Sequence, residues 1–346
     1  MPAEWEPHES TWLAWPHLRG DWPGKFEPVP WVYAEIVRNL ARRERVDLIV
    51  NSARAEKRAR AVLEKADALS DNVCFRHWRT DRVWTRDSGC IFLKPSEERG
   101  DPALLALNFQ FNAWAKYSNY KFDEKVGRRM ARAAGARVVE PVSGDHRVVL
   151  EGGSIDVNGC GTLLTTEECL LSTEQQRNPP MDRVAYEQMF ADYFGAQSVI
   201  WLGGGIGGDD THGHVDDIAR FVAPSTVVSM IEANAQDENY SALQHNLGRL
   251  KASRTPDDQK LDVVEIPMPR PIVFERRRLP ASYANFYIAN GAVLVPVFND
   301  PNDRIALNTL TELFPTREIV PIYSGDLIWG FGALHCMTQQ QPARSS

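Results

Sequence analysis

The sequence predicts an α/β protein in which a helix-plus-strands unit occurs five times within a single domain, residues 1–346. The first observation behind this prediction is that helical patterns begin at a nearly regular spacing, roughly 57 to 65 residues apart. They start near Ala53, Ser118, Met181, Glu238 and Asp303. The second observation is that a short apolar run, rich in β-branched or aromatic residues, follows each helix. These runs are Val73–Trp78, Ala136–Val139, Gln197–Leu202, Leu261–Ile266 and Glu318–Tyr323.

The chain ahead of these units opens with a segment rich in Trp and Pro. A helix is then predicted at Trp31–Arg43 and a strand at Val46–Val50. No linker or low-complexity tract separates the units, which favours one domain over two. Disorder is expected only at Pro342–Ser346 and at Lys94–Asp101.

Four residues with chemical potential occupy a common place in the units. Asp87, Glu151, His214 and Cys336 each lie 33 or 34 residues after the start of a predicted helix. Radial repetition of small sheets encloses a central channel, and equivalent positions then converge near its axis. We therefore expect these four side chains to line one pocket.

Composition excludes several classes of function. The 346 residues are 43% hydrophobic and 25% charged, with a net charge of -7. That charge argues against nucleic acid as a partner and suits a small cationic substrate. No apolar run is long enough to span a membrane and no signal peptide is evident, so a cytoplasmic location is predicted. The five cysteines contain no CxxC, which disfavours a disulfide framework or a zinc ribbon.

The segment from Asp209 to Asp217 concentrates ionisable side chains. If it is extended, His212, His214 and Asp216 share one face, because side chains of a strand alternate. Such a set can shuttle protons and hold a cation, or bind a metal; a hydrated loop with a hydrogen-bonded histidine is the simpler alternative. The glycine run 203–208 just before it matches G-x-G-x-x-G, but the following Asp-Asp would repel a pyrophosphate, so a dinucleotide site is rejected.

Three other candidates are ambiguous when each is taken alone. Asp87 follows Trp84, and this pair could hold a guanidinium by hydrogen bonding and stacking, or form an ordinary turn beside a core indole. Glu151 precedes two glycines and could orient His214 or lie solvated at a strand end. Cys336 also lies among glycines, and a reactive thiol requires access and a lowered pKa.

Taken together, eight motifs in the right order resemble the agmatine deiminase and bacterial peptidyl-arginine deiminase family of the guanidino-group-modifying superfamily. They are Met1–Pro16, Trp84–Gly89, Asn108–Trp114, Leu150–Ser154, Gly161–Glu168, Gly213–Asp216, Ala281–Gly291 and His335–Gln340. The resemblance covers almost the whole chain. It implies a five-bladed α/β propeller, the pentein fold, in agreement with the five units.

The resemblance also implies roles for individual residues. Cys336 is the expected nucleophile, His214 the acid/base with Glu151 beside it, and Asp87 and Asp216 the carboxylates that bind the guanidinium. Trp84 and Trp114 complete the expected substrate pocket. Attack of the thiolate, loss of ammonia and hydrolysis of the thiouronium would give a ureido product. This chemistry requires no metal and no organic cofactor.

Local departures from the family leave the substrate open. Phe331 and Ala333 interrupt an expected glycine run, Ala115-Lys116 replaces expected glycines, and Cys90 stands where proline is expected. Agmatine, converted to N-carbamoylputrescine for putrescine synthesis, is the first expectation; peptidyl-arginine and free arginine are the alternatives. From other classes, a metal-dependent hydrolase using His212, His214 and Asp216, or a non-catalytic propeller that binds arginine or polyamines, remain. Homo-oligomerisation is also left open.

Overall fold

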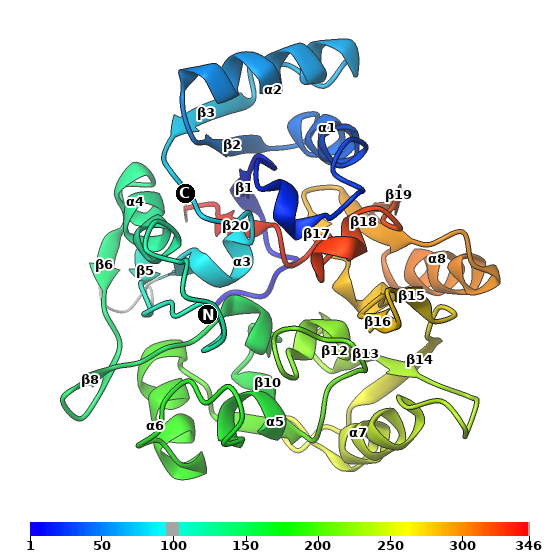
Figure 1. Cartoon of the computed structure of the whole chain (residues 1–346). Coiled ribbons are helices and arrows are strands. Elements are labelled where there is room, and N and C mark those ends of the chain that lie inside the picture. Colours follow the sequence, from blue (N-terminus) through cyan, green and yellow to red (C-terminus); the bar gives the residue numbers. More distant parts are fainter. Residues whose placement is uncertain (95–103, 345–346) are drawn as a thin grey trace.

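A computed structural model describes residues 1–94 and 104–344 of the chain. Within these residues, five sheets of three or four strands lie around the middle of the molecule, and the long helices lie toward its periphery (Figure 1). The sheets, in spatial order of their strands, are β20 (Gln339–Pro342), β1 (His8–Ala14), β2 (Arg45–Val50) and β3 (Val73–His77); β4 (Ile91–Leu93), β5 (Leu105–Leu107) and β6 (Arg137–Val139); β9 (Asp156–Val157), β10 (Thr162–Thr166) and β11 (Ser198–Leu202); β12 (Ala219–Ala223), β13 (Thr226–Ile231) and β14 (Asp262–Pro267); β17 (Tyr287–Ala289), β18 (Ala292–Val297) and β19 (Glu318–Tyr323).

Each sheet repeats one pattern: an antiparallel pair of strands, a helical crossover, and a strand parallel to the second. The crossovers are α1 (Val29–Ala41), α4 (Val126–Ala133), α5 (Glu167–Leu171) with α6 (Arg183–Phe194), α7 (Tyr240–Ala252), and α8 (Pro301–Leu313). Two hairpins, β7 (Val142–Ser143) with β8 (His146–Arg147) and β15 (Ile272–Phe274) with β16 (Arg277–Leu279), are inserted between sheets. In the first sheet the antiparallel pair joins β20 to β1, so the two ends of the chain meet there.

The predicted strands agree closely with those observed, but the first repeat was wrongly assigned. Helix α2 (Ala53–Lys65) and β3 were predicted as the first unit; they are instead an addition at the outer edge, and α1 is the true crossover. The 33- or 34-residue offset is therefore not a property of the fold. Measured from the observed crossover helices, it ranges from 25 residues (Val126 to Glu151) to 58 (Val29 to Asp87).

Helix ends follow local capping chemistry where that chemistry is present. Helix α8 begins after Asp300, which forms a capping box with Asp303, and α6 ends at Gly195 in the left-handed conformation. The helix predicted to start at Ser118 begins at Val126 instead, because the preceding segment is held as a loop. There, the Asp123 carboxylate accepts hydrogen bonds from the backbone of Asp81 and Arg82.

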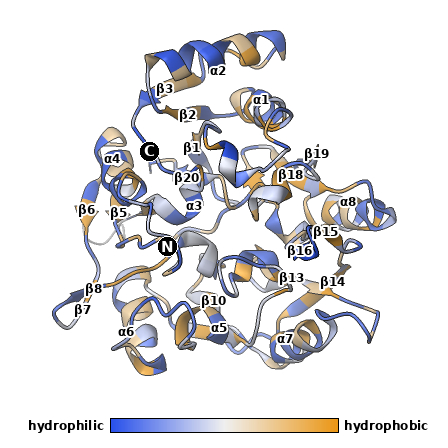
Figure 2. Ribbon diagram, in the orientation of Figure 1, coloured by the Kyte–Doolittle hydropathy of each residue, from blue (hydrophilic) through white to orange (hydrophobic). Residues whose placement is uncertain are grey.

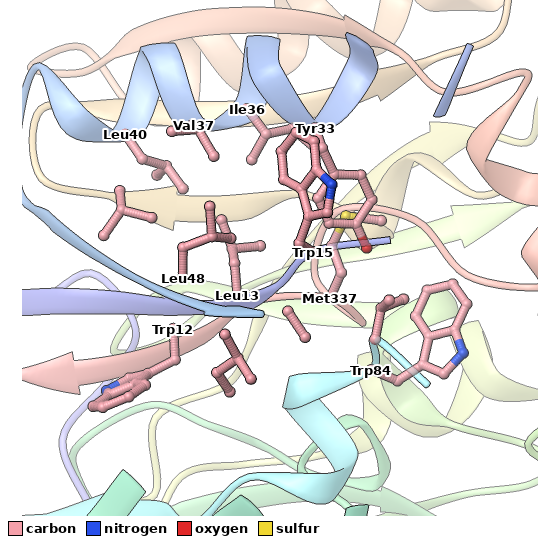
Figure 3. Close-up of a cluster of buried hydrophobic side chains, with 14 of the residues drawn as sticks. Trp12, Leu13, Trp15, Tyr33, Ile36, Val37, Leu40, Leu48, Trp84 and Met337 are labelled. Carbon is pink, nitrogen blue, oxygen red and sulfur yellow. The ribbon is translucent and has the colours of Figure 1, made fainter. Parts of the chain in front are cut away.

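The core lies between the strands and the inner faces of the helices. In the first sheet, Leu13 and Leu48 pack against Tyr33, Ile36 and other buried residues of α1 (Figure 3). Hydrophobic and hydrophilic residues alternate along the helices, as expected where only one helix face packs on a sheet (Figure 2). No helix in the described ranges is long and apolar enough to cross a bilayer.

The predicted disorder at the C-terminal end is wrong for residues 342–344. Pro342 ends β20 and is buried, the backbone amide of Ala343 donates to Pro7, and Arg344 donates to the carbonyl of Ala134. These contacts tie the segment to β1 and α4. Of the second predicted disordered segment, all but Lys94 lies outside the described residues, and Lys94 pairs with Glu6.

Candidate active site

A short helical turn precedes the first strand of each of four sheets and presents a polar side chain to the middle of the molecule. These turns are α3 (Thr85–Ser88), Gly152–Ser154, Val215–Asp217 and Tyr283–Asn285. Cys336 holds the corresponding place before β20. The structure therefore brings Asp87, Glu151, His214 and Cys336 together as predicted, with Asp216 beside them. It adds Asn285, which the sequence analysis did not single out.

Cys336 lies against Asn285 and Asp216. The Asn285 amide donates to the Cys336 sulfur at 3.1 Å, and its carbonyl oxygen accepts from the backbone amides of His335 and Cys336. The sulfur is 3.7 Å from Asp216 Oδ2. Burial and the surrounding carboxylates raise the Cys336 pKa well above its usual value, so the free enzyme holds a thiol.

His214 lies between two carboxylates. Its Nδ1 is 3.8 Å from Asp87 Oδ1, and its Nε2 is 3.7 Å from Glu151 Oε2. Burial alone would lower the His214 pKa, but Asp87, Glu151 and the nearby Cys169 outweigh it and raise the pKa well above its usual value. The ring is therefore set to be an imidazolium that can donate a proton.

Glu151 is kept ionised by a buried arginine. Arg177, from the loop before α6, donates to Glu151 Oε1 at 3.1 Å, and both side chains are fully buried. Burial would raise the Glu151 pKa, but Arg177 and His214 lower it to about 2. Arg177 is a second residue that the sequence analysis missed, since no recognisable motif surrounds it.

Asp87 is oriented by Trp114 and Gly153. The Trp114 indole donates to Asp87 Oδ2 at 2.9 Å, and the amide of Gly153 donates to Oδ1 at 3.1 Å. Burial, together with Asp216 and Glu151, raises the Asp87 pKa to about 6 against the opposing effect of His214. An uncompensated buried carboxylate is costly and favours a cationic ligand.

Gly153 marks the point where these side chains meet. A β-carbon added there would lie 2.6 Å from His214 Nδ1, 3.0 Å from Asp216 Oδ2 and 3.0 Å from Asp87 Oδ1. No side chain fits at that position without displacing catalytic candidates. The absence of a side chain at Gly153 therefore permits the close approach of these groups.

A pocket leads from the surface to Asp87 and Cys336. Its lining comprises Gly20, Asp21, Arg82, Trp84, Asp87, Trp114, Tyr117, Asp210, Thr211, Gly330, Phe331, Gly332 and Cys336. Both predicted aromatic residues, Trp84 and Trp114, are among them. His214, Glu151 and Asp216 lie behind the pocket wall and are at most 1% exposed. The prediction that Asp87, Glu151, His214 and Cys336 all line one pocket is therefore correct for Asp87 and Cys336 but wrong for Glu151 and His214.

Asp216 is held from behind by a buried ionic network. His335 Nδ1 contacts Asp216 Oδ2 at 2.7 Å, and His335 Nε2 contacts Glu4 Oε2 at 2.9 Å. Glu4 also pairs with Arg86 and Arg220. Burial would raise the Asp216 pKa, but His335 outweighs it and lowers that pKa, so Asp216 stays ionised. Glu4 lies within the Met1–Pro16 motif but was not singled out, because no feature of that motif indicates a side chain that reaches the centre.

The predicted single face of His212, His214 and Asp216 is wrong. The Asp209 carboxylate accepts from the amides of Gly213 and His214 and curls the segment, and β12 begins only at Ala219. His212 has a φ of 65° and its Nε2 lies 3.1 Å from Ser172 Oγ, away from the pocket lining. The metal set proposed from these three residues is therefore not assembled.

We expect Glu4→Gln to lower the free energy of unfolding. Removing one partner of a buried ion pair leaves the other charge uncompensated and costs about 3–5 kcal/mol. Urea denaturation of this variant, beside the exposed control Glu9→Gln, measures the difference. Equal stability of the two variants would show that the network does not depend on the Glu4 charge.

We expect Asp87→Asn to stabilise the fold at pH 8. Because the folded pKa of about 6 exceeds the usual 3.8, the unfolded chain ionises more readily and stability is lost as pH rises between these values. At pH 8 the ionised Asp87 lowers the free energy of unfolding by on the order of 3 kcal/mol, and at pH 5 this loss is smaller. Denaturation at both pH values, with exposed Asp71→Asn as control, tests this; a variant less stable than the parent at pH 8 contradicts it.

The model of the Porphyromonas-type peptidyl-arginine deiminase family matches residues 1–342. The chain belongs to this family. It is also 35% identical over 369 aligned residues to an agmatine deiminase of Pseudomonas aeruginosa, covering 99% of this chain and 95% of that protein. The family predicted from the motifs, and with it the predicted class of enzyme, a deiminase, are confirmed.

Solved structures place this deiminase family chain in a mixed α/β fold. The agmatine deiminase of Enterococcus faecalis superposes with a TM-score of 0.89 at 29% identity, covering 100% of this chain and 96% of that one. An amidinotransferase of Microseira wollei, 10% identical, superposes with a TM-score of 0.52 over 100% of this chain and 97% of its own, and shares the fold alone.

Proposed function

We propose that this protein is an agmatine deiminase that converts agmatine and water to N-carbamoylputrescine and ammonia. The observation that carries the proposal is the meeting of two buried carboxylates, Asp87 and Asp216, with the thiol of Cys336 and the imidazole of His214. A guanidinium is planar and offers hydrogen-bond donors on both sides, which two carboxylates can accept. We further propose that the five sheets are the blades of a five-bladed α/β propeller with this site at its axis.

The guanidinium itself activates the nucleophile. In the free enzyme, burial and Asp216 disfavour the Cys336 thiolate. A bound cation between Asp87 and Asp216 offsets these negative charges and lowers the Cys336 pKa, so the thiol releases its proton to solvent when substrate is present. The sulfur then attacks the guanidinium carbon, and a C–S bond forms in a tetrahedral adduct.

His214 supplies and recovers the proton. As an imidazolium it donates to the departing nitrogen; the C–N bond breaks, ammonia leaves and a thiouronium remains on Cys336. The neutral ring then takes a proton from water, which attacks the same carbon. The C–S bond then breaks, the hydroxyl of the adduct loses its proton to solvent, and the ureido product is released with Cys336 restored as the thiolate. Glu151, fixed by Arg177, stabilises the imidazolium form.

Hydrogen bonds and ion pairs between segments around the pocket favour a small substrate over a peptide. Asp210 lines the pocket and binds Lys116 at 2.7 Å, Tyr117 at 2.5 Å and Arg277 at 2.8 Å. The Arg277 guanidinium in turn lies 4.0 Å from the ring centroid of Phe331. Four separate segments are thereby joined beside the pocket, which leaves less room there for a peptide backbone.

A carboxylate in the same pocket is suited to the second charge of agmatine. Asp21 lines the pocket, and its Oδ2 has no hydrogen-bond partner within the described residues, whereas its Oδ1 lies 3.6 Å from Arg82. An ammonium group would complement this carboxylate. In peptidyl-arginine, the end opposite the guanidinium is joined to the peptide backbone and carries no ammonium group.

Ammonia release from agmatine, free arginine and an arginine-containing peptide, measured side by side with EDTA present, tests the proposal. We expect turnover of agmatine alone. Preferential turnover of the peptide would favour the peptidyl-arginine alternative. Tight binding of agmatine without ammonia release would instead indicate a binding protein.

A further inference from the structure

A second group of potential ligands lies behind the catalytic histidine. Glu151, Cys169 and His214 come from three separate segments: the end of the strand-like run before Gly152, helix α5, and the loop before β12. Each offers one ligand atom, and the three atoms lie within 4.8 Å of one another. All three residues are buried. The proposed reaction uses Glu151 and His214 but gives Cys169 no task.

The donor atoms of this group are largely unoccupied. Glu151 Oε2 and both ring nitrogens of His214 are buried without a hydrogen-bond partner in the part of the chain that the structure describes. Unpaired buried polar atoms are rare and call for an explanation. Glu151 Oε1, in contrast, is taken by Arg177, which leaves Oε2 as the single free oxygen.

Cys169 is fixed in direction toward this group. Its backbone amide donates to Thr166 Oγ1, the N-cap of α5, which anchors the first turn of the helix. The thiol lies close enough to interact with His214. A carboxylate oxygen, an imidazole nitrogen and a thiolate sulfur are the three ligand types that zinc prefers in proteins.

We propose that Glu151, Cys169 and His214 form a binding site for Zn²⁺ or a similar divalent transition metal, and that occupation of this site inhibits the enzyme. Three protein ligands with a fourth position open is a common zinc arrangement. Ligand atoms around a tetrahedral zinc lie roughly 3.3–3.8 Å apart, a spacing that follows from Zn–N, Zn–O and Zn–S bonds of about 2.0–2.3 Å. His214 Nε2 and Glu151 Oε2 are already 3.7 Å apart, and any other pair has to approach by at most about 1.5 Å. The Arg177 charge opposes a second cation, so binding is reversible rather than permanent.

Inhibition, but not binding, rests on the proposed deiminase function. A metal can bind His214 and Cys169 only as it displaces the ring proton and the thiol proton, which are released to solvent. The bound metal therefore removes the proton donor for the departing ammonia. Asp87, 3.8 Å from His214 Nδ1, is one of the residues that line the pocket. The ion and the guanidinium use different ligands, because Asp87 and Asp216 stay free when the metal is bound.

Cobalt(II) binding measures the site without any turnover. In the Cys336→Ser protein, titration with Co²⁺ should produce the near-ultraviolet charge-transfer band of a cobalt–thiolate bond. The band should disappear when Cys169→Ala is added and persist when the exposed Cys160→Ser is added instead. Absence of the band, or its persistence without Cys169, would overturn the proposal while leaving the deiminase function untouched.

Zinc inhibition provides the second arm. We expect Zn²⁺ to inhibit the otherwise unaltered enzyme, EDTA to reverse the inhibition, and Cys169→Ala to raise the half-inhibitory zinc concentration at least tenfold. Circular dichroism confirms folding of the variant, and Cys169→Ser serves as a second substitution of similar size. Equal inhibition of the Cys169 variants and the parent would place the zinc on another ligand, such as Cys336, and overturn the inference.

Discussion

Cys336→Ser is expected to abolish ammonia release, by at least about 10³-fold in kcat, while agmatine still binds. A serine hydroxyl is far less acidic than a thiol, and the bound cation cannot make it an alkoxide at neutral pH. The binding contacts are retained, since Asp87 and Asp216 are unchanged. Steady-state ammonia release and calorimetric titration with agmatine measure the two properties separately.

The matched control is Cys160→Ser, because Cys160 is an exposed free cysteine outside the pocket lining. It should behave as the parent protein in both measurements. Substantial activity in the Cys336→Ser protein would contradict a covalent mechanism through this sulfur. Loss of activity in the Cys160 variant as well would point to general sensitivity to thiol replacement.

His214→Asn is expected to lower kcat by about 10²–10⁴-fold, the usual contribution of a positioned general acid or base. Asparagine fills much of the imidazole volume but cannot transfer a proton. Ammonia departure and water attack should both slow, so the deficit should persist across the pH range in which the parent enzyme works. Measurement of kcat from pH 6 to 9 tests this expectation.

His212→Asn provides the control two residues away. His212 carries the same side chain but is directed to Ser172, so the variant should keep nearly full activity. A comparable loss of activity in both variants would show that the whole segment is sensitive to substitution, and would not support a specific role for His214. Recovery of His214→Asn activity at high pH would contradict the role of the imidazolium as proton donor.

Much of the site could be predicted because its residues lie in short, distinctive sequence contexts. Asp87 and Glu151 each adjoin glycines or an indole, and Cys336 lies among glycines, so local chemistry draws attention to them. Asn285 carries no such signal. The hairpin β15–β16 is inserted ahead of it, so Asn285 does not lie 33 or 34 residues after a predicted helix start.

Other contributions are invisible in sequence because they arise only on folding. Glu4 and Arg177 act through contacts with residues far away in the chain, and the residues next to them in sequence do not indicate a buried ion pair. The prediction that His212 and His214 share one face is wrong because the Asp209 carboxylate accepts hydrogen bonds from two backbone amides. Side-chain to backbone bonds of this kind compete with extended structure.

The pairing of β20 with β1 has a consequence for biosynthesis. Cys336 lies only three residues before β20, and β20 pairs with β1, a strand that is synthesised long before it. Because domains fold as the chain emerges from the ribosome, four sheets can form while the first still has an unpaired edge. The nucleophile is thus installed last, and a nascent chain that stalls before Gln339 carries a nearly finished scaffold with no catalytic power.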